Sequence, residues 1–307
     1  MRTADNHGTA LDPDWLRRID LDDDSVAARA RRYVAGVRES DATVARVTES
    51  EELIQAVACL DLTSLGADDS DTRVEALCAE ARAPLASASP EGPPRATTVA
   101  AVCVLPASVA AAVAALGDSP VPVAAACGFP AGEGTVKQKI DETRLAAESG
   151  AREVDVVIDR RLILGEEWRD VYDEVRKLRD ASAGLTLKVI LRTGTLPTSS
   201  HVARAGLTCA AAGADFLKTS TGMEPVNATL EAGIAMAAAI RAYHERTGYR
   251  VGLKPAGGLR TASDALEWTA LTRGELDANW IDPGLFRLGA SSLLGALRAR
   301  LSDLANR

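Results

Sequence analysis

The sequence predicts an α/β protein, a (β/α)8 TIM barrel with an extra N-terminal helical segment. From about Val57 onward, short apolar runs alternate eight times with stretches of helical periodicity. The connections are short, and 307 residues suit one barrel of this kind. A doubly wound open sheet is the main competitor. The first apolar run ends in Asp61 without the glycine-rich loop that such a sheet usually carries, so the barrel is favoured.

The eight apolar runs are the expected strands. They cover residues 56–62, 97–105, 121–128, 153–158, 186–191, 215–220, 250–255 and 286–289. After the fourth run, one helical face is formed by Trp168, Val171, Val175 and Leu178. Glycines are expected to end three of the intervening helices, at Gly150, Gly184 and Gly213.

Residues 1–50 differ in character and are predicted to form an N-terminal helical extension, while residues 51–307 form the catalytic barrel. The extension holds an acidic cluster at residues 20–24 and four arginines within residues 29–38, an order that suits a helix dipole. Trp15 and Leu16 favour an arm packed on the outside of the barrel. A contact with a second copy of the chain is the alternative. The proline-rich stretch 89–95 is predicted to be a surface loop.

Composition excludes several classes of protein. The net charge of -8 and the pI near 5.1 argue against a nucleic-acid or anionic-membrane binder, although an anionic substrate remains compatible. No run of 18 apolar residues and no hydrophobic signal region are present.

The five scattered cysteines are interpreted as reduced core residues of a cytoplasmic protein. The three histidines lie in unrelated segments, which argues against a zinc site or a histidine-based triad.

Two lysines stand at the ends of apolar runs, in frames of small residues. Lys218 lies in Ala-Asp-Phe-Leu-Lys-Thr-Ser-Thr-Gly, and Lys254 in Val-Gly-Leu-Lys-Pro-Ala-Gly-Gly. Burial disfavours the charged amine, and two such lysines side by side are expected to lower each other's pKa. A lysine with a pKa of about 10.4 is only about 0.1% neutral at pH 7.4, whereas a decrease of roughly 3 units makes about half of it neutral. The pair therefore predicts carbonyl chemistry through a Schiff base.

Charged residues occur in four successive expected strands. Asp155, Lys188, Lys218 and Lys254 fall in the fourth to the seventh, and neighbouring strands lie only about 4.8 Å apart. We expect the four side chains to share one cavity, with Phe216 also pointing inward. Asp155 is suited to shuttle protons. A lysine paired with a carboxylate for structural reasons is the alternative for any single position. For Lys188, charge balance and catalysis remain equally open.

Two glycine-rich segments follow the seventh and eighth strands. They read Ala-Gly-Gly-Leu-Arg-Thr at residues 256–261 and Gly-Ala-Ser-Ser at residues 289–292, where a helix begins. Backbone N–H groups at a helix N-terminus bind anions, and barrels often hold phosphate after strands 7 and 8. The segments predict a phosphate site, to which Arg260 adds charge and Gly222 a third edge. Tight turns that merely require glycine are the alternative.

Seven ordered motifs together resemble deoxyribose-phosphate aldolase. They lie at residues 59–65, 102–106, 128–132, 153–157, 218–222, 254–258 and 289–292. The resemblance covers about residues 55–300, and the long N-terminal segment looks like that of the branch with the animal enzymes. It implies a class I aldolase, without metal or organic cofactor. Such an enzyme reversibly cleaves 2-deoxy-D-ribose 5-phosphate to acetaldehyde and D-glyceraldehyde 3-phosphate. It also implies small-molecule partners, with dimers or larger homo-oligomers in some members.

The resemblance assigns roles to individual residues. Lys218 matches the Schiff-base lysine, Lys254 the second lysine that lowers the pKa of the first, and Asp155 the proton-transferring aspartate. Asp61 matches a supporting acidic residue, and Lys188 a further polar residue of the catalytic site. The family's phosphate contacts match Gly222, Gly257, Gly258, Arg260, Gly289, Ser291 and Ser292.

Two positions depart from the family pattern. Met223 follows the Lys-Thr-Ser-Thr-Gly motif, where a further lysine is common, and Arg192 stands where glutamate or alanine is usual. We hypothesise that Arg192 replaces the missing cation. Met223 keeps open a related class I lysine aldolase acting on another, or an unphosphorylated, substrate. A catalytically silent barrel that binds a metabolite is the less favoured alternative.

Overall fold

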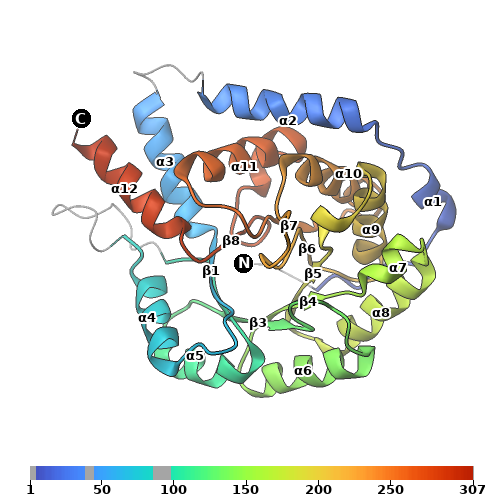
Figure 1. Ribbon diagram of the computed structural model, residues 1–307, viewed down its shortest axis with the longest axis horizontal. Helices are drawn as coiled ribbons and strands as arrows, with labels where there is room; N and C mark the ends of the chain where they lie inside the picture. The colour runs from blue at the N-terminus through green and yellow to red at the C-terminus, as the bar shows by residue number, and fades with distance from the viewer. Residues whose placement is uncertain (1–4, 39–44, 86–97, 307) are drawn as a thin grey trace.

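The expected barrel is confirmed in the computed structural model, which describes residues 5–38, 45–85 and 98–306. Eight parallel strands form one sheet in the order β7-β6-β5-β4-β3-β2-β1-β8. Bridges from Leu253 to Phe286 and from Ala256 to Gly289 bring β7 against the β8 side, so that the sheet closes (Figure 1). The strands are β1 Leu60–Ser64, β2 Ala101–Val104, β3 Val123–Cys127, β4 Glu153–Val157, β5 Thr186–Ile190, β6 Phe216–Lys218, β7 Gly252–Lys254 and β8 Leu288–Ala290.

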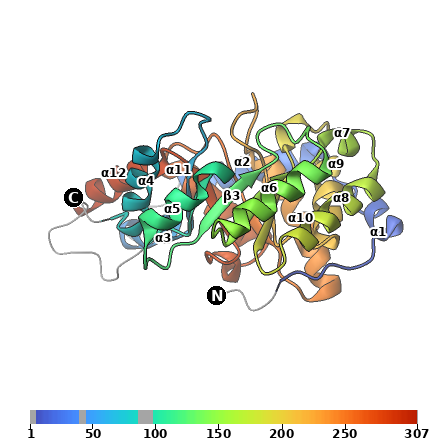
Figure 2. The same ribbon diagram turned by 90° about the horizontal axis from the view of Figure 1, so that it is seen from below.

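Helices surround the strands, as Figure 2 shows for α5 and α6 on the outer side of β3. They are α4 Asp71–Arg82, α5 Val109–Leu116, α6 Val136–Glu148, α7 Arg160–Leu164, α8 Trp168–Ala181, α9 Ser199–Ala211, α10 Leu230–Thr247, α11 Ala262–Glu275 and α12 Leu293–Ala305. Short 3-10 turns occur at η1 Pro106–Ser108, η2 Thr193–Thr195 and η3 Ala278–Trp280. Gly150, Gly184 and Gly213 follow α6, α8 and α9 with positive φ angles, as expected for glycines at helix ends.

The first strand begins later in the chain than the sequence predicted. Residues 56–58, expected to be extended, are the last turn of helix α3 (Ala45–Ala58), and β1 begins only at Leu60. Ala56 and Val57 are buried in the helix as completely as they would be in a strand. A continuous apolar run does not reveal where a buried helix ends and a strand begins.

The N-terminal extension forms α1 (Pro13–Arg17) and α2 (Asp23–Arg38), and α2 lies outside α10 and α11 (Figure 1). Trp15 and Leu16 are buried, which confirms an arm packed on the barrel. The ring of Trp15 stacks on Tyr243 of α10, with centroids 6.1 Å apart. The proposed division between residues 50 and 51 falls within α3 and stays a prediction. The proline-rich stretch 89–95 lies outside the described residues.

The strands bury side chains on two sides, one facing the surrounding helices and one facing the inside of the barrel. Val, Leu and Ile side chains of the strands pack outward against the helices in the main hydrophobic core. Inside the barrel, β2 and β3 contribute a small apolar cluster of Ala101, Cys103, Ala124 and Ala126. Strands β1, β4, β5, β6 and β7 contribute charged side chains to the same space, and the residue before β8 contributes Arg287. Because the apolar side is built from small residues, it leaves room for long lysine side chains opposite. All five cysteines are buried and unpaired.

Candidate active site

The barrel interior brings three lysines onto one carboxylate, that of Asp155. Lys218 and Lys254 each donate to Oδ2 at 2.7 Å, and Lys188 donates to Oδ1 at 2.8 Å. The strand register explains the arrangement, because Asp155 is paired with Lys188 across β4 and β5, and Lys218 with Lys254 across β6 and β7. All four side chains are buried. The four side chains therefore point inward and meet, as expected, but of the four only Lys218 lies in the wall of the cavity at the strand ends.

A second layer of charge lies further down the barrel. Asp61 accepts from Lys254 and lies 3.4 Å from Lys188. Arg287 Nη1 donates to Asp61 Oδ1 at 2.5 Å, and Arg287 Nη2 donates to Glu153 Oε1 at 2.8 Å. Lys188 Nζ also reaches Glu153 Oε2 at 2.5 Å.

Sequence reasoning did not select Glu153 or Arg287 as site residues. Alternation along β4 could have identified Glu153, since it lies two residues before Asp155 and so shares its face. Arg287 directly precedes the short strand β8, where one arginine looks like an ordinary loop residue.

Charge balance in the interior differs from the expected three lysines beside one aspartate. The cluster inside the barrel, as far as the described residues show it, consists of three buried carboxylates and four buried cationic side chains. The carboxylates are those of Asp61, Glu153 and Asp155, and the cations are Lys188, Lys218, Lys254 and Arg287. The cations therefore exceed the carboxylates by one. A cluster of this composition is neutral when one amine loses its proton.

The two lysines that drew attention in the sequence have opposite pKa shifts. Burial lowers the pKa of Lys218, against the attraction of Asp155, and the positive charge of Lys254 lowers it further. Burial also disfavours the charged form of Lys254, but Asp155 and Asp61 outweigh this effect and raise its pKa. The expectation that the pair lower each other's pKa is therefore wrong for Lys254. Asp155, although buried, has a pKa well below its usual value because three lysines surround it.

A cavity of about 280 Å³ opens at the carboxyl ends of the strands and has Lys218 in its wall. All seven residues expected to bind phosphate line it: Gly222, Gly257, Gly258, Arg260, Gly289, Ser291 and Ser292. Gly257 has a φ of +79°, and a Cβ on it would lie 2.7 Å from the Cα of Gly222. The loops after β6 and β7 can approach this closely only because residue 257 is glycine, while Gly222 is required for its φ of +91°, since a Cβ on it would lie 3.7 Å from the Cα of Gly257.

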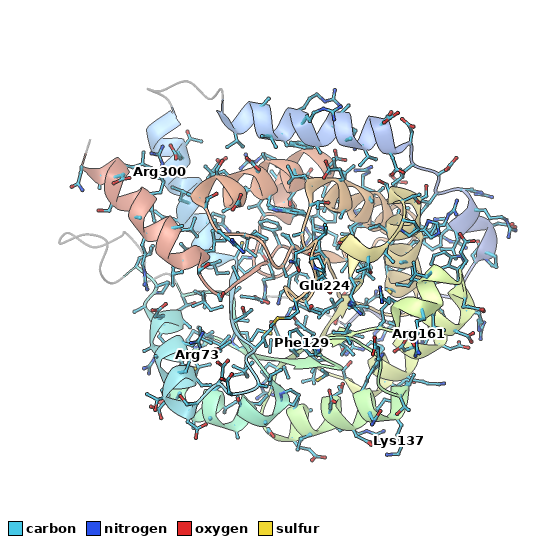
Figure 3. All side chains as sticks on the ribbon, viewed as in Figure 1. Arg73, Phe129, Lys137, Arg161, Glu224 and Arg300 are labelled. Atoms are coloured by element: carbon cyan, nitrogen blue, oxygen red, sulfur yellow. The ribbon has the colours of Figure 1, made fainter. Side chains whose placement is uncertain are left out.

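The positions of two arginines relative to the cavity differ from those that the sequence predicted. Arg73 of α4 lines the cavity and was not anticipated, whereas Arg192 is not among the residues found in its wall. Arg192 Nε instead donates to Glu224 at 3.1 Å, and its Nη1 donates to the carbonyl of Ala131 at 2.8 Å. Figure 3 shows Arg73 at α4 and Glu224 near the middle of the barrel. The hypothesis that Arg192 replaces a phosphate-binding lysine is not supported by this geometry.

The described residues contain neither a metal-binding cluster nor a membrane-spanning helix. No group of three or more His, Cys, Asp and Glu side chains in that part of the chain is arranged to hold a metal ion. Within the same ranges, no helix is both long and apolar enough to cross a membrane.

The closed barrel with a cavity at the carboxyl ends of its strands places this chain in the class of (β/α)8 barrel enzymes. A family model described as DeoC/LacD family aldolase matches residues 54–296. Deoxyribose-phosphate aldolase of Homo sapiens is 41% identical over 305 residues, covering 97% of this chain and 94% of that protein. The Mus musculus enzyme of the same name is 43% identical over 300 residues, covering 96% and 93%.

A solved structure shares the fold. The tetrameric deoxyribose phosphate aldolase from Aeropyrum pernix is 21% identical, covers 85% of this chain and 99% of its own, and superposes with a TM-score of 0.65. The chain belongs to the DeoC/LacD family of aldolases. The resemblance seen in its motifs is confirmed.

Proposed function

We propose that this protein is a 2-deoxy-D-ribose 5-phosphate aldolase that forms acetaldehyde and D-glyceraldehyde 3-phosphate reversibly through a Schiff base on Lys218. One observation carries the proposal. Lys218 is the buried lysine whose pKa is lowered, and it is also the charged residue shared by the interior cluster and the cavity. Relatives with 41% and 43% identity that are named deoxyribose-phosphate aldolase support this substrate.

The reaction begins at the Lys218 amine. Its neutral Nζ attacks the aldehyde carbon of the open-chain sugar, and the carbinolamine loses water to give a protonated imine. The C3 hydroxyl then gives up its proton to a base as the C2–C3 bond breaks, and the electron pair of that bond passes into the imine. Glyceraldehyde phosphate is released and an enamine remains on Lys218. Protonation of the enamine and hydrolysis release acetaldehyde and regenerate the amine.

Proton transfers in this scheme are assigned to Asp155. Its Oδ2 already contacts the Nζ of Lys218 at 2.7 Å, within reach of each intermediate formed there. Lys254 contacts the same oxygen at 2.7 Å, so it holds the carboxylate in place while disfavouring a second positive charge on Lys218. Asp61 and Lys188 serve in this proposal as supporting residues that fix Lys254 and Asp155.

The phosphate end of the substrate is assigned to the loops after β6, β7 and β8. Ser291 and Ser292 lie at the start of α12, where free backbone N–H groups favour an anion. Arg260 lines the same part of the cavity and supplies positive charge. Among the lining residues that the structure describes, Arg73, Lys218 and Arg260 carry ionisable groups, all three are basic, and none is a carboxylate.

Borohydride reduction in the presence of acetaldehyde tests the covalent step. We expect a stable adduct on Lys218 by peptide mass mapping, and none in Lys218→Met. Lys137→Met, which removes an exposed lysine of α6, is the matched control and should still give the adduct. An adduct confined to another lysine, or no adduct at all, would contradict the proposal. The absence of any adduct would favour the silent metabolite-binding barrel.

A second candidate function is an aldolase of the same class with an unphosphorylated or different aldehyde substrate. It is favoured by Met223, an apolar side chain that is 60% exposed and lines the cavity. Comparison of kcat/KM for deoxyribose 5-phosphate and deoxyribose separates the two candidates. A clear preference for the phosphate ester supports the first, and equal values support the second. A cytoplasmic location belongs to the same proposal and is supported by the five unpaired cysteines.

A further inference from the structure

We propose that Arg287 is a positioning residue that keeps Lys218 in its neutral form, by supplying the one cationic side chain in excess of the buried carboxylates. The inference rests on the proposed function, since it concerns how the same nucleophile is prepared. Arg287 is not in the wall of the substrate cavity. It lies toward the opposite end of the barrel, where it lines a second cavity of about 400 Å³ together with Glu153 and Phe216.

Arg287 is fixed by direct contacts with the buried carboxylates of the barrel interior. Nη1 lies 2.5 Å from Asp61 Oδ1 and 3.2 Å from Glu153 Oε2, and Nη2 lies 2.8 Å from Glu153 Oε1. Its Nε donates to the carbonyl of Pro283, and its guanidinium carbon lies 5.6 Å from the centre of the Phe216 ring. Asp282 faces the same lower cavity but is exposed, so it is not part of the buried charge balance.

The four buried cations differ in the number of carboxylates that they contact. Lys188 contacts three carboxylates, those of Asp61, Glu153 and Asp155. Lys254 and Arg287 contact two each. In the described part of the chain, Lys218 contacts one carboxylate, which it shares with Lys254. Because one cation too many is present, the group with the fewest carboxylate partners is the easiest to deprotonate.

The remaining group beside Lys218 does not change this balance. Cys103 of β2 has its Sγ 3.9 Å from Asp155 Oδ2, and burial raises the pKa of this thiol to about 11. It is therefore uncharged at neutral pH. Arginine suits this position because its planar guanidinium contacts Asp61 and Glu153 at the same time.

Charge-changing variants test this inference against a purely structural role. Arg287→Gln leaves three carboxylates and three cations, so Lys218 should stay protonated to higher pH. Glu153→Gln leaves two carboxylates and four cations, and should have the opposite effect. The double variant Arg287→Gln with Glu153→Gln restores an excess of one cation. Arg287→Lys is the conservative control that retains the charge.

The readout is the rate of borohydride-trapped adduct formation from acetaldehyde as a function of pH. This rate requires the neutral amine, so it increases as pH rises through the pKa of Lys218. We expect the midpoint to move up by about one pH unit in Arg287→Gln, the size expected of one unit charge acting over roughly 10 Å at an effective dielectric constant of about 20. The midpoint should move down in Glu153→Gln and return close to the parent value in the double variant and in Arg287→Lys.

The outcomes separate this inference from the proposed function. Absence of an adduct in the parent protein overturns the proposed function itself. Adducts whose pH midpoints are the same in all variants, or shift in one direction for both single variants, overturn the role of Arg287 alone. If Arg287→Gln does not fold, the comparison of Glu153→Gln with the double variant replaces it. The double variant should then have the higher midpoint by about one unit, and equal midpoints overturn the inference.

Discussion

Lys218 and Asp155 are in direct contact, with Nζ lying 2.7 Å from Oδ2. The contact joins an amine whose pKa is lowered to a carboxylate whose pKa is held well below its usual value. Both shifts favour an amine able to lose its proton beside a carboxylate that stays ionised. A nucleophile and a proton-transfer group are therefore already side by side within the folded barrel.

The two central lysines should differ in their effect on stability. Lys218→Met removes the amine that burial disfavours in its charged form, so we expect a higher unfolding temperature at pH 7. The gain is about 1 kcal/mol for each unit by which the Lys218 pKa is lowered. Lys254→Met leaves Asp61 and Asp155 with one cationic partner fewer, and should cost about 3–5 kcal/mol.

The two substitutions are matched in size and in the residue introduced, so calorimetry of the two variants compares charge placement alone. The pH dependence provides a second measurement. A lowered folded-state pKa means that the unfolded chain binds more protons, so the parent gains stability as pH rises from the folded pKa of Lys218 toward its unfolded value. Lys218→Met should lack this gain. Equal destabilisation by both variants would contradict the assignment of unequal pKa shifts.

Acid should weaken the fold through its buried carboxylates. The pKa of Asp61 is lowered, because Arg287, Lys254 and Lys188 together outweigh the cost of burying it. A lowered folded-state pKa stabilises the protein above the unfolded value near 3.8, and this stability is lost progressively as pH falls below about 4.

Asp61→Asn should therefore have a lower unfolding temperature at pH 7 but a flatter decline between pH 5 and about 3 than the parent. Asp141→Asn, at an exposed i to i+4 pair with Lys137, is the matched control and should follow the parent curve. Parallel acid transitions for Asp61→Asn and the parent would show that Asp61 is not held ionised.

Most of the lysine and aspartate cluster could be predicted from the sequence, but the two residues that contact it from below, Glu153 and Arg287, could not. Lys218 and Lys254 were recognisable because a cation at the end of an apolar run is costly unless it has a purpose. Glu153 was hidden by the stronger signal of Asp155 on the same strand. The contribution of Arg287 depends on barrel closure, which brings β8 beside β1 and across from β4. No local pattern encodes that proximity, just as none located the end of α3 within an apolar run.

The Arg192–Glu224 pair should hold the loop that carries Gly222. Glu224 is buried and accepts from the backbone N–H of Thr221 at 3.1 Å and from its hydroxyl at 2.8 Å, while Arg192 holds the opposite side of the carboxylate. Glu224→Gln should raise KM for deoxyribose 5-phosphate several-fold with a smaller change in kcat, since it loosens a phosphate loop and leaves Lys218 unaltered.

Arg192→Ala should give the same pattern more weakly, because Thr221 keeps its contacts with Glu224. The double variant should resemble Glu224→Gln alone, as expected for two residues that act through one contact. Steady-state kinetics of the three variants measures this. A fall in kcat with an unchanged KM would point instead to a disturbance around Lys218.

Asn6 should anchor the N-terminal extension to the barrel. Its side-chain amide donates to the carbonyls of Ala210 and Ala214 at 2.9 and 2.8 Å, and its side-chain oxygen accepts from the hydroxyl of Tyr243 at 2.8 Å. Asn6→Ala leaves these buried groups without their partner and should lower the free energy of unfolding by about 2–4 kcal/mol. His7→Ala, at the exposed neighbouring position, should be close to neutral.

The remaining cation at the cavity wall should influence the preference for phosphate. Arg73 and Met223 both line the cavity, and Arg73 Nε donates to Ser64 at 2.9 Å while contacting Asp69 at 3.0 Å. Met223→Lys should lower KM for deoxyribose 5-phosphate about three- to ten-fold, the range of a partly exposed charge-assisted contact worth roughly 1 kcal/mol. Arg73→Gln should raise it by a similar factor.

Unphosphorylated deoxyribose is the internal control, because a charge at the cavity wall acts on the phosphate and leaves the reacting carbonyl untouched. Its kcat/KM should change less than two-fold in either variant. Added salt should also reduce the benefit of Met223→Lys, since the new side chain lies in an exposed position where ions screen it. If both substrates respond equally, the two side chains act on the shape of the cavity, and the phosphate preference arises from the glycine loops and Arg260.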